Sequence, residues 1–409
     1  MAISNLHIKK IRVENYKSLK ASEIEFKEGL NIIIGKNGAG KSNMLDFVYR
    51  YGSRTPFSFS FRNIRTSNAN YSVTLQYLNK RVKNIFSYSM ERLKSNSQNA
   101  NAFTHTITLN KTEGAKEILK DRKVSFKNVI STKILSKSLI EEDEVVLNEF
   151  RIFGSIKRRY VSFIIPVDAH WIFKPSRIVI DRDNENLIDI NDEEYSDFGF
   201  FTSLEFEILS KEFKSLHLVK EVNVDSVKEE FSSILSEYLN ETEINFILNQ
   251  YTLIKEIRFN PNINIYSIEQ NVIIENIYIE FLIDNDWLPW SYLSDGTKRM
   301  FYLISEALSL EKGVLLIEEP ELGIHPHQLY KIMDFLKEQS RDKQVIISTH
   351  SPLVLDILEE KELDRIIIAK YDNGTKFNHL TKEEINKAKR YMNEVGELSY
   401  YWLHSDLEK

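Results

Sequence analysis

The sequence predicts an α/β fold with a mainly parallel core sheet, preceded by an antiparallel β-region. Three observations support this. The short apolar run Leu30–Ile34 leads into a glycine-rich loop, and apolar residues at helical spacing follow it up to Gly52. From about residue 294 to residue 370 strands alternate with helices, as in a parallel sheet covered on both faces. Before the loop, alternating side chains predict two strands.

The glycine-rich loop, Gly35–Ser42, fits the spacing G-x4-G-K-[ST] between a strand and a helix. Its glycines let the backbone wrap closely around an anion, and the N–H groups and helix dipole favour phosphate. Lys41 is expected to reach the β- and γ-phosphates, and the Ser42 hydroxyl to ligate Mg²⁺. A glycine turn arising by chance fits poorly with these flanks. We expect a nucleoside triphosphate to be held by Gly35, Asn37, Gly38, Ala39, Gly40, Lys41, Ser42 and Asn43.

The segments after the loop favour strands first and helices later. Strand candidates are Tyr71–Leu78, Asn84–Glu91 and His105–Leu109. The polar sequence between about residues 95 and 144 predicts exposed loops and short helices. Helical spacing between residues 200 and 251 is not sustained as heptads, so we expect a compact helical insert rather than a coiled coil.

The last third of the chain has the clearest α/β pattern. Strands resume near residues 253–283, and caps and prolines then mark helix starts. The expected elements are a helix capped by Ser294 or Asp295 and closed by Gly313, a buried strand at 314–317, a helix from Pro326, a buried strand at 345–348, a short helix from Pro352, a strand at 365–370 and a helical tail from Thr381.

Composition limits the possible classes of protein. At 409 residues the chain is long enough for two or three domains, and 42% hydrophobic and 28% charged residues are typical of soluble proteins. No run approaches the roughly 18 apolar residues of a membrane span, and the N-terminus lacks a signal-peptide core. The absence of cysteine excludes disulfides and thiolate sites. We expect a cytoplasmic protein without a membrane partner.

The net charge of −6 argues against a surface that is basic throughout, but it allows a local basic groove. The candidates are Arg62–Arg65, Lys120–Lys127 and Lys157–Arg159. Such runs are more often solvated faces. Nucleic-acid binding therefore stays open.

Three further motifs follow the phosphate loop in a fixed order. They are L-S-D-G-T at residues 293–297, E-E-P-E-x-x-x-H-P at residues 318–326 and S-T-H-S-P at residues 348–352. With the opening E-N-Y-K-S at residues 14–18, the chain resembles the ABC-type ATPase heads. Within them it is similar to the RecF/SMC-like and OLD-like AAA-family ATPases, as found in anti-phage systems such as PARIS, Septu and retron-associated ATPases.

The resemblance covers about residues 8–52 and 278–370 and implies a P-loop NTPase of ABC-ATPase type. Four parts are expected. Residues 1–95 form the N-terminal half of the head with the phosphate loop (Walker A), and residues 96–250 form an insert, mixed then helical, that serves as a partner or oligomer lobe. Residues 251–375 form the C-terminal half with the signature, Walker B and switch histidine, and residues 376–409 form a helical tail.

The buried run Val314–Ile317 ends in two carboxylates, which a parallel sheet presents at its C-terminal edge beside the phosphate loop. The resemblance gives Glu318 the Mg²⁺-side role; Asp is usual there, so contact with the metal could be direct or water-bridged. It gives Glu319 the role of polarising the attacking water, and His350 contact with the γ-phosphate. The alternatives are a solvated acidic strand end and a structural histidine.

The signature residues Ser294, Asp295 and Gly296 open a helix, whose free N–H groups and dipole make a second anion site. One head does not need two γ-phosphate sites. The resemblance therefore implies that this site serves the ATP of a partner head, with two ATPs buried between subunits and Lys298 adding positive charge. An ordinary capped helix is the alternative, since S-D-G is also common in turns.

Two further candidates carry less information. Gln76 is the first glutamine after the phosphate loop and the candidate Q-loop ligand of Mg²⁺, although its strand-like setting suits a surface residue equally well. His325 and His327 stand at the family's D-loop, and without a third ligand we do not expect a metal there.

The resemblance implies an ATP- and Mg²⁺-dependent ATPase that works as a homodimer or higher homo-oligomer. We expect its nucleotide state to control a separately encoded effector, such as a nuclease, in anti-phage defence. The first alternative is a DNA-repair or DNA-binding RecF/SMC-like ATPase. A transporter subunit fits less well, because about 250 residues separate Lys41 from Ser294 and the signature departs from L-S-G-G-Q. A self-contained OLD-type nuclease would need a Toprim domain, and only 59 residues follow His350.

Overall fold

The computed structural model describes residues 3–51, 70–79, 82–92, 102–113, 116–129, 158–161, 176–181, 241–268, 271–308, 310 and 312–405. Contacts divide the chain into two compact units. The first comprises Met1–Val161, Leu310–Leu322 and Met333–Lys409, and the second comprises Ser162–Ser309 and Gly323–Ile332.

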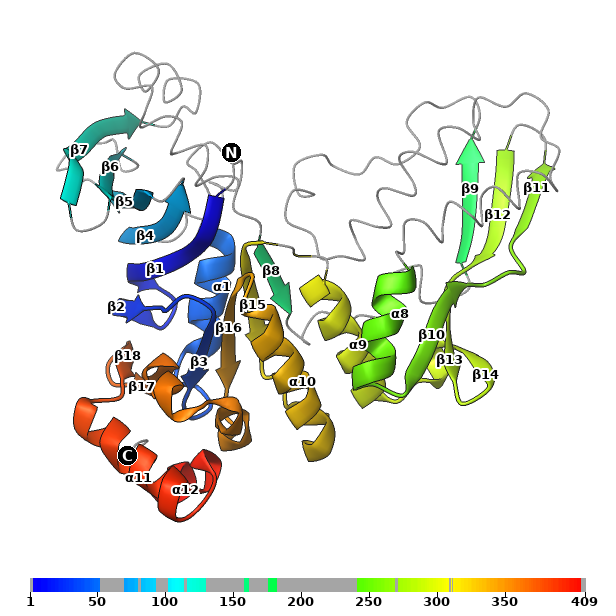
Figure 1. Ribbon diagram of the computed structural model, residues 1–409. Coiled ribbons are helices and arrows are strands. Elements are labelled where there is room, and N and C mark those ends of the chain that lie inside the picture. Colours follow the sequence, from blue (N-terminus) through cyan, green and yellow to red (C-terminus); the bar gives the residue numbers. More distant parts are fainter. Residues whose placement is uncertain are drawn as a thin grey trace. The chain divides into compact units, whose positions relative to one another are not determined.

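The first unit is built on a six-stranded core sheet in the order β18-β17-β3-β16-β15-β8 (Figure 1). Its strands are parallel except for the edge strand β18, which pairs antiparallel with β17. Burial on both faces explains why the central strands read as continuous apolar runs. Helix α1 (Lys41–Tyr51) packs over β15, β16 and β8. The strands are β3 (Leu30–Ile34), β8 (Arg158–Val161), β15 (Val314–Glu318), β16 (Gln344–Thr349), β17 (Ile366–Tyr371) and β18 (Thr375–His379).

A second sheet of the first unit is antiparallel and has the order β2-β1-β4-β5-β6-β7. In its last hairpin, β6 contains the predicted strand His105–Leu109, whereas β7 lies where loops and short helices are predicted. Threonines alternate along the sequence of β6, and such β-branched residues favour an extended strand that pairs with β7. The strands are β1 (Ile3–Tyr16), β2 (Leu19–Glu25), β4 (Asn70–Asn79), β5 (Val82–Arg92), β6 (Ala102–Glu113) and β7 (Lys116–Val129).

The buried side chain of Gln344 joins the two sheets of the first unit. Its Oε1 accepts the N–H of Ile8 at 2.9 Å, and its Nε2 donates to the carbonyls of Ile8 at 2.9 Å and Lys27 at 3.1 Å. Gln344 begins β16, and Ile8 lies in β1. All the hydrogen-bonding capacity of this amide except one lone pair is therefore used to hold β1 against the core sheet.

The second unit contains two three-stranded antiparallel sheets, β10-β13-β14 and β11-β12-β9. Edge-to-face packing of Phe281 on Phe301, with Trp290 beside both, fixes β13 against α9. The elements are α8 (Glu241–Tyr251), α9 (Asp295–Leu308), the 3₁₀ turn η5 (Trp290–Tyr292), β9 (Ser176–Asp181), β10 (Ile254–Phe259), β11 (Asn264–Ile268), β12 (Asn271–Ile277), β13 (Ile279–Ile283) and β14 (Asp286–Pro289). Helix α10 (Pro326–Gln339) contributes residues to both units.

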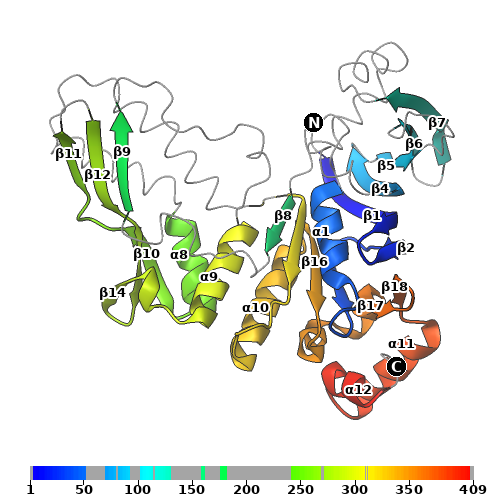
Figure 2. The same cartoon turned by 180° about the vertical axis from the view of Figure 1, so that it is seen from behind.

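Two helices end the described chain, α11 (Lys382–Glu394) and α12 (Leu398–His404), as Figure 2 shows from behind. A capping box between Thr381 and Glu384 starts α11. Helix α12 packs on the 3₁₀ segment η6 (Pro352–Ile357), and the Asp356 carboxylate accepts the N–H of Ser399 at 2.7 Å. A second 3₁₀ segment, η7 (Glu360–Arg365), precedes β17.

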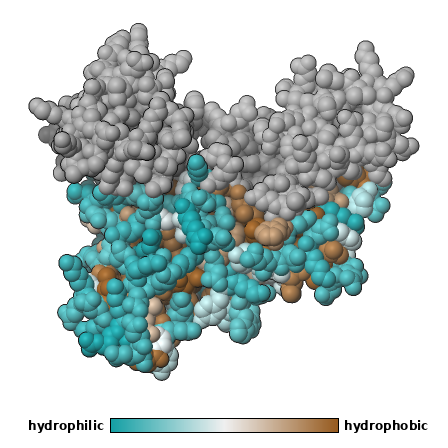
Figure 3. Space-filling model, viewed as in Figure 1, coloured by the Kyte–Doolittle hydropathy of each residue, from teal (hydrophilic) through white to brown (hydrophobic). Residues whose placement is uncertain are grey.

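On the face shown in Figure 3, hydrophilic residues cover most of the described surface and apolar residues form small patches. Among the described helices none is both long enough and apolar enough to cross a membrane.

The structure confirms the predicted α/β class, the antiparallel N-terminal region and the mainly parallel core sheet. Most of the predicted helical insert at residues 200–251 lies outside the described residues, which there begin at α8. The predicted insert, residues 96–250, also supplies β8 to the core sheet. The tail is helical, as expected.

Replacing Gln344 by leucine tests the link between the sheets. Gln344→Leu leaves the N–H and carbonyl of Ile8 and the carbonyl of Lys27 without this partner, so we expect the free energy of unfolding to fall by on the order of 3 kcal/mol. Denaturant titration measures the loss. The control Gln250→Leu, at an exposed position on α8, should change stability by no more than about 0.5 kcal/mol. Equal effects of the two variants would contradict the assignment.

Candidate nucleotide site

The candidate site lies at the carboxyl edge of the core sheet, where three parallel strands end together. Glu318 of β15 pairs with Ser348 of β16, and Thr349 of β16 pairs with Ile34 of β3. The next residues along the chain are Glu319, His350 and Gly35. The register therefore brings Walker B, the switch histidine and the phosphate loop to one edge.

The phosphate loop bends around the ammonium group of Lys41, which is only 5% exposed. Lys41 Nζ donates to the carbonyls of Gly35 at 2.7 Å and Lys36 at 3.1 Å. Lys41 opens α1, and Ser42 beside it is exposed to solvent. A buried cation at a helix N-terminus fits the polyphosphate of a nucleotide.

Position 40 must be glycine, because two distant parts of the chain pack against the loop there and leave no room for a side chain. Its φ is +92°, and a Cβ there would lie 1.9 Å from Thr375 Oγ1 and 2.5 Å from Ser18 Oγ. These two hydroxyls are 2.7 Å apart, and Asn43 Nδ2 donates to Ser18 Oγ at 2.8 Å. Ser18 comes from the E-N-Y-K-S segment, so this segment supports the loop.

The same segment also contacts α1 directly. Tyr16 Oη donates to Asp46 Oδ2 at 2.6 Å, and Lys17 Nζ lies 2.6 Å from the same oxygen. Asp46 lies in α1, one turn beyond Lys41. The turn between β1 and β2 thus fixes the helix whose N-terminus faces the phosphates.

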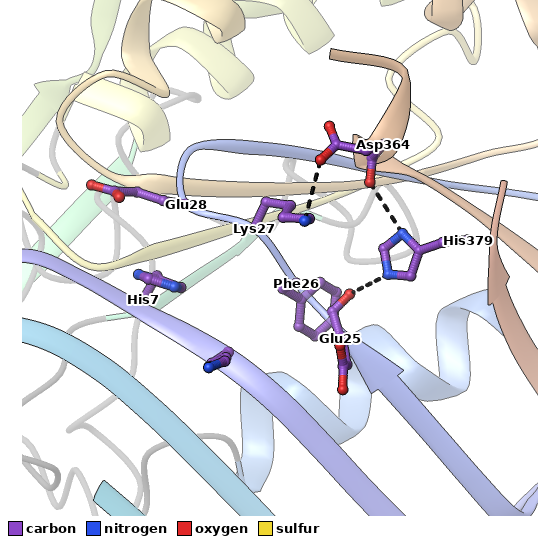
Figure 4. Close-up of a pocket in the computed structure, with 8 residues that line it drawn as sticks. His7, Glu25, Phe26, Lys27, Glu28, Asp364 and His379 are labelled. Atoms are coloured by element: carbon purple, nitrogen blue, oxygen red, sulfur yellow. Dashed lines mark hydrogen bonds and ion pairs between the residues drawn. The ribbon is translucent and has the colours of Figure 1, made fainter. Parts of the chain in front are cut away.

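Strand β18, which carries Thr375, is held at its other end by His379. The His379 ring nitrogens lie 3.1 Å from the Asp364 carbonyl and 2.9 Å from the Glu25 carbonyl (Figure 4). Beside the ring is a cavity of about 400 Å³ whose lining includes His7 and the ion pair Lys27–Asp364. Anchoring at both ends keeps β18 against β2 and Thr375 against the loop.

Walker B ends in a backbone conformation that few residues adopt. Glu318 is buried and 7% exposed. Glu319 has a φ of +48°, and its N–H donates to the Ser348 carbonyl at 2.7 Å. A left-handed glutamate costs about 1–3 kcal/mol, and such strain clusters at functional sites. The strained residue is Glu319 itself, the second of the two adjacent carboxylates.

The switch histidine faces two carboxylates. His350 Nδ1 lies 3.2 Å from Glu319 Oε1 and 3.4 Å from Glu321 Oε1. Glu321 Oε1 also accepts from Thr349 Oγ1 at 2.6 Å and from the N–H groups of His350 and Ser351, both at 3.2 Å. Within the described part of the chain, Glu321 Oε2 is buried without a hydrogen-bond partner, and an unpaired buried acceptor costs about 1–3 kcal/mol.

The signature residues belong to the second unit and are described there by themselves. Ser294 caps α9: its Oγ accepts the Thr297 N–H at 3.2 Å and lies 2.8 Å from Thr297 Oγ1. Ser294 and Asp295 are exposed to solvent. Gly296 is needed because a Cβ would lie 3.0 Å from the Gly323 carbonyl. Lys298 Nζ lies over the Trp290 ring, 5.6 Å from its centroid.

The remaining candidates lie elsewhere. Gln76 lies in β4 of the antiparallel sheet, opposite His7, and its metal role stays a prediction. His325 and His327 stack with ring centroids 5.4 Å apart in the second unit. Among the described residues, no three His, Asp or Glu side chains form a metal site by themselves. Magnesium would be held by Ser42, Glu318 and the phosphates, an oxygen set that suits this cation.

Sequence reasoning missed two kinds of residue. Ser18 was identified only as part of a motif, and Thr375 carries no local signal, because its contact with Gly40 arises from packing of edge strand β18. Glu321 stood within the E-E-P-E motif without an assigned role. The available signal in the sequence was its spacing, two residues after Glu319. In the structure these residues form a tight turn, in which the Leu322 N–H donates to the Glu319 carbonyl at 3.0 Å.

A family model described as "AAA domain, putative AbiEii toxin, Type IV TA system" matches residues 30–356. The match includes the phosphate loop, the signature, Walker B and the switch histidine.

Two relatives and one solved structure resemble the chain over different lengths. The "Retron Vc95 probable ATPase" of Vibrio cholerae serotype O1 biovar El Tor is 24% identical over 88% of this chain and 74% of that protein. "DNA replication and repair protein RecF" of Francisella tularensis subsp. novicida is 31% identical over 26% of this chain and 30% of that protein. The SMC head domain of Pyrococcus furiosus, solved with the C-terminal domain of ScpA, has a TM-score of 0.44 at 14% identity, covering 95% of this chain and 100% of that one.

Gly40→Ala tests how the loop is braced. The added methyl would overlap Thr375 Oγ1 at a positive φ, so we expect the melting temperature without nucleotide to fall and ATP binding to be lost. Gly38→Ala is the matched control: Gly38 also has a positive φ, +79°, but nothing lies within 4 Å of its Cβ position. Thermal unfolding should show a clearly larger loss for Gly40→Ala. Equal losses would mean that backbone strain alone, and not the brace, governs the loop.

Proposed function

We propose a function from one premise: the chain belongs to the AAA-domain family that matches residues 30–356 and is an ATPase of ABC type. We propose that it sandwiches ATP between two copies of itself. Its nucleotide state then controls a separately encoded effector. The pairing of Glu319 with His350 beside the phosphate loop is the observation that carries this proposal. Both residues directly follow strands that end level with the phosphate loop, which supports a role at the γ-phosphate of a loop-bound ATP.

Each residue at this edge has a role suited to its position. Lys41 exchanges the carbonyls of Gly35 and Lys36 for phosphate oxygens. Ser42 and Glu318 would hold the Mg²⁺, which would supply positive charge to the phosphates. Glu319 orients the attacking water and accepts its proton, and His350 contacts the γ-phosphate.

The signature supports assembly between copies. Ser294 and Asp295 are exposed at the start of α9, where the helix dipole favours an anion, and Lys298 lies one turn further on. A head that already holds its own phosphates at Gly35–Ser42 has no use for a second γ-phosphate site. We assign the signature of one copy to the ATP of the other.

The purpose of the cycle is inferred from the retron relative, which covers most of this chain. We place the protein in the cytoplasm, in an anti-phage system in which assembly on ATP restrains or releases an effector such as a nuclease. The RecF relative supports a second candidate, an ATPase that acts on DNA in repair. The two candidates differ in the partner that the ATP-bound form holds.

Two substitutions separate ATP binding from hydrolysis. Lys41→Ala should abolish ATP binding, because it removes the buried cation of the loop. Glu319→Gln should preserve binding, lower kcat on the order of 100-fold or more and trap the ATP-bound assembly. Equilibrium nucleotide titration, steady-state hydrolysis and light scattering after size exclusion measure these three quantities.

Glu360→Gln, at an exposed position outside the site, is the control and should behave as wild type. Normal hydrolysis by Glu319→Gln would refute the assigned base. A monomeric Glu319→Gln variant at saturating ATP would refute the sandwich.

The Glu319→Gln variant also distinguishes the two purposes. Affinity purification of the trapped form from its native cells, with and without nuclease treatment, should recover one stoichiometric protein partner that depends on ATP. Recovery of DNA alone, or of a transmembrane protein, would overturn the effector proposal. Lys41→Ala provides the nucleotide-free control.

A further inference from the structure

We propose that Glu321 is the positioning residue of the switch histidine, holding the loop that carries His350 so that the ring meets the γ-phosphate. This inference rests on the role proposed above for His350. Glu321 follows Walker B by a single tight turn, and its side chain is 9% exposed. It reaches the end of β16 rather than the phosphate loop.

One carboxylate oxygen of Glu321 accepts hydrogen bonds from three successive residues, 349–351, which include the switch histidine. Oε1 accepts from the Thr349 hydroxyl at 2.6 Å and from the N–H groups of His350 and Ser351, both at 3.2 Å. Three successive residues therefore turn around a single acceptor. The bond from the Thr349 hydroxyl has the short length of a charge-assisted hydrogen bond, the two N–H bonds are longer, and the Ser351 N–H also donates to Thr349 Oγ1 at 2.9 Å. Together these bonds fix the backbone that carries the ring.

The same oxygen also helps to orient the imidazole ring. His350 Nδ1 lies 3.4 Å from Glu321 Oε1 and 3.2 Å from Glu319 Oε1. Both neighbours are carboxylate oxygens, which only accept, so Nδ1 carries the hydrogen. Nε2 is then the ring atom that faces the phosphate, and because a phosphate oxygen only accepts, Nε2 contacts it as a donor in the ring that carries both hydrogens. Glu321 selects both the place and the orientation of His350.

The second oxygen of Glu321 adds a cost to this arrangement. Glu321 Oε2 is buried and has no hydrogen-bond partner among the described residues, and Ser348 Oγ, on β16, is likewise buried without one. Leaving a buried polar atom unpaired opposes folding. A carboxylate kept under this cost fits a role in the reaction, in which Oε1 organises the switch.

A double-mutant cycle on the full chain tests the proposal. Glu321→Ala should lower kcat on the order of 10- to 100-fold, because the ring loses its position, and leave the Kd for ATP unchanged. Glu321→Gln should recover most of the rate, because its amide oxygen can accept the same three hydrogens. In a His350→Ala background, Glu321→Ala should have no further effect on kcat.

Thr349→Val is the milder variant if Glu321→Ala does not fold. It removes one of the three donors to Oε1 and should lower kcat a few-fold at an unchanged Kd for ATP. Glu360→Gln controls for loss of a carboxylate elsewhere on the first unit.

Three results would overturn the proposal: normal kcat in Glu321→Ala or Thr349→Val, no recovery by Glu321→Gln, or additive losses in the double variant with His350→Ala. Failure of the function proposed for His350 looks different. In that case His350→Ala alone would hydrolyse ATP at the wild-type rate, whatever Glu321→Ala does.

Discussion

The site depends on the parallel register of β3, β16 and β15. Because Ile34 lies level with Thr349 and Ser348 level with Glu318, three strands end within one residue of each other. Each strand is then followed by a residue proposed for chemistry. A slip of one residue in any pair would turn alternate side chains to the opposite face and separate Glu319 from His350. The register of the buried apolar strands thus determines where the polar loops that follow them lie relative to one another.

The phosphate loop is not an autonomous motif in this protein. At Gly40 the loop packs against the hydroxyl groups of Ser18 and Thr375, two residues that are separated by most of the length of the chain. Thr375 is in turn held because β18 is anchored at His379. Nucleotide binding therefore requires the antiparallel sheet, the edge strand and the loop to be folded together, which agrees with the loop's dependence on glycine at a crowded point.

The sequence predicted what periodicity and motifs encode. Buried strands, helix caps and the phosphate loop were found because apolar runs and glycines at fixed spacing have few alternative structures. Of the β6–β7 hairpin, the sequence predicted only the strand His105–Leu109 within β6. Strand β7 was not predicted, because its polar sequence is held by backbone pairing with β6 that no local signal reveals. Glu321 was missed as a site residue for a similar reason. Its partners are 28 to 30 residues further along the chain, and only the parallel register brings them to its carboxylate.

The amide of Gln344 has a mechanical consequence. It ties Ile8, in the antiparallel sheet, to the first residue of β16, and the last residue of that strand precedes the switch histidine. A buried strand of six residues is stiff along its length, so it cannot be displaced at one end and remain still at the other. A load placed on β1 by another molecule would therefore reach, in part through this side chain, the strand that leads to His350.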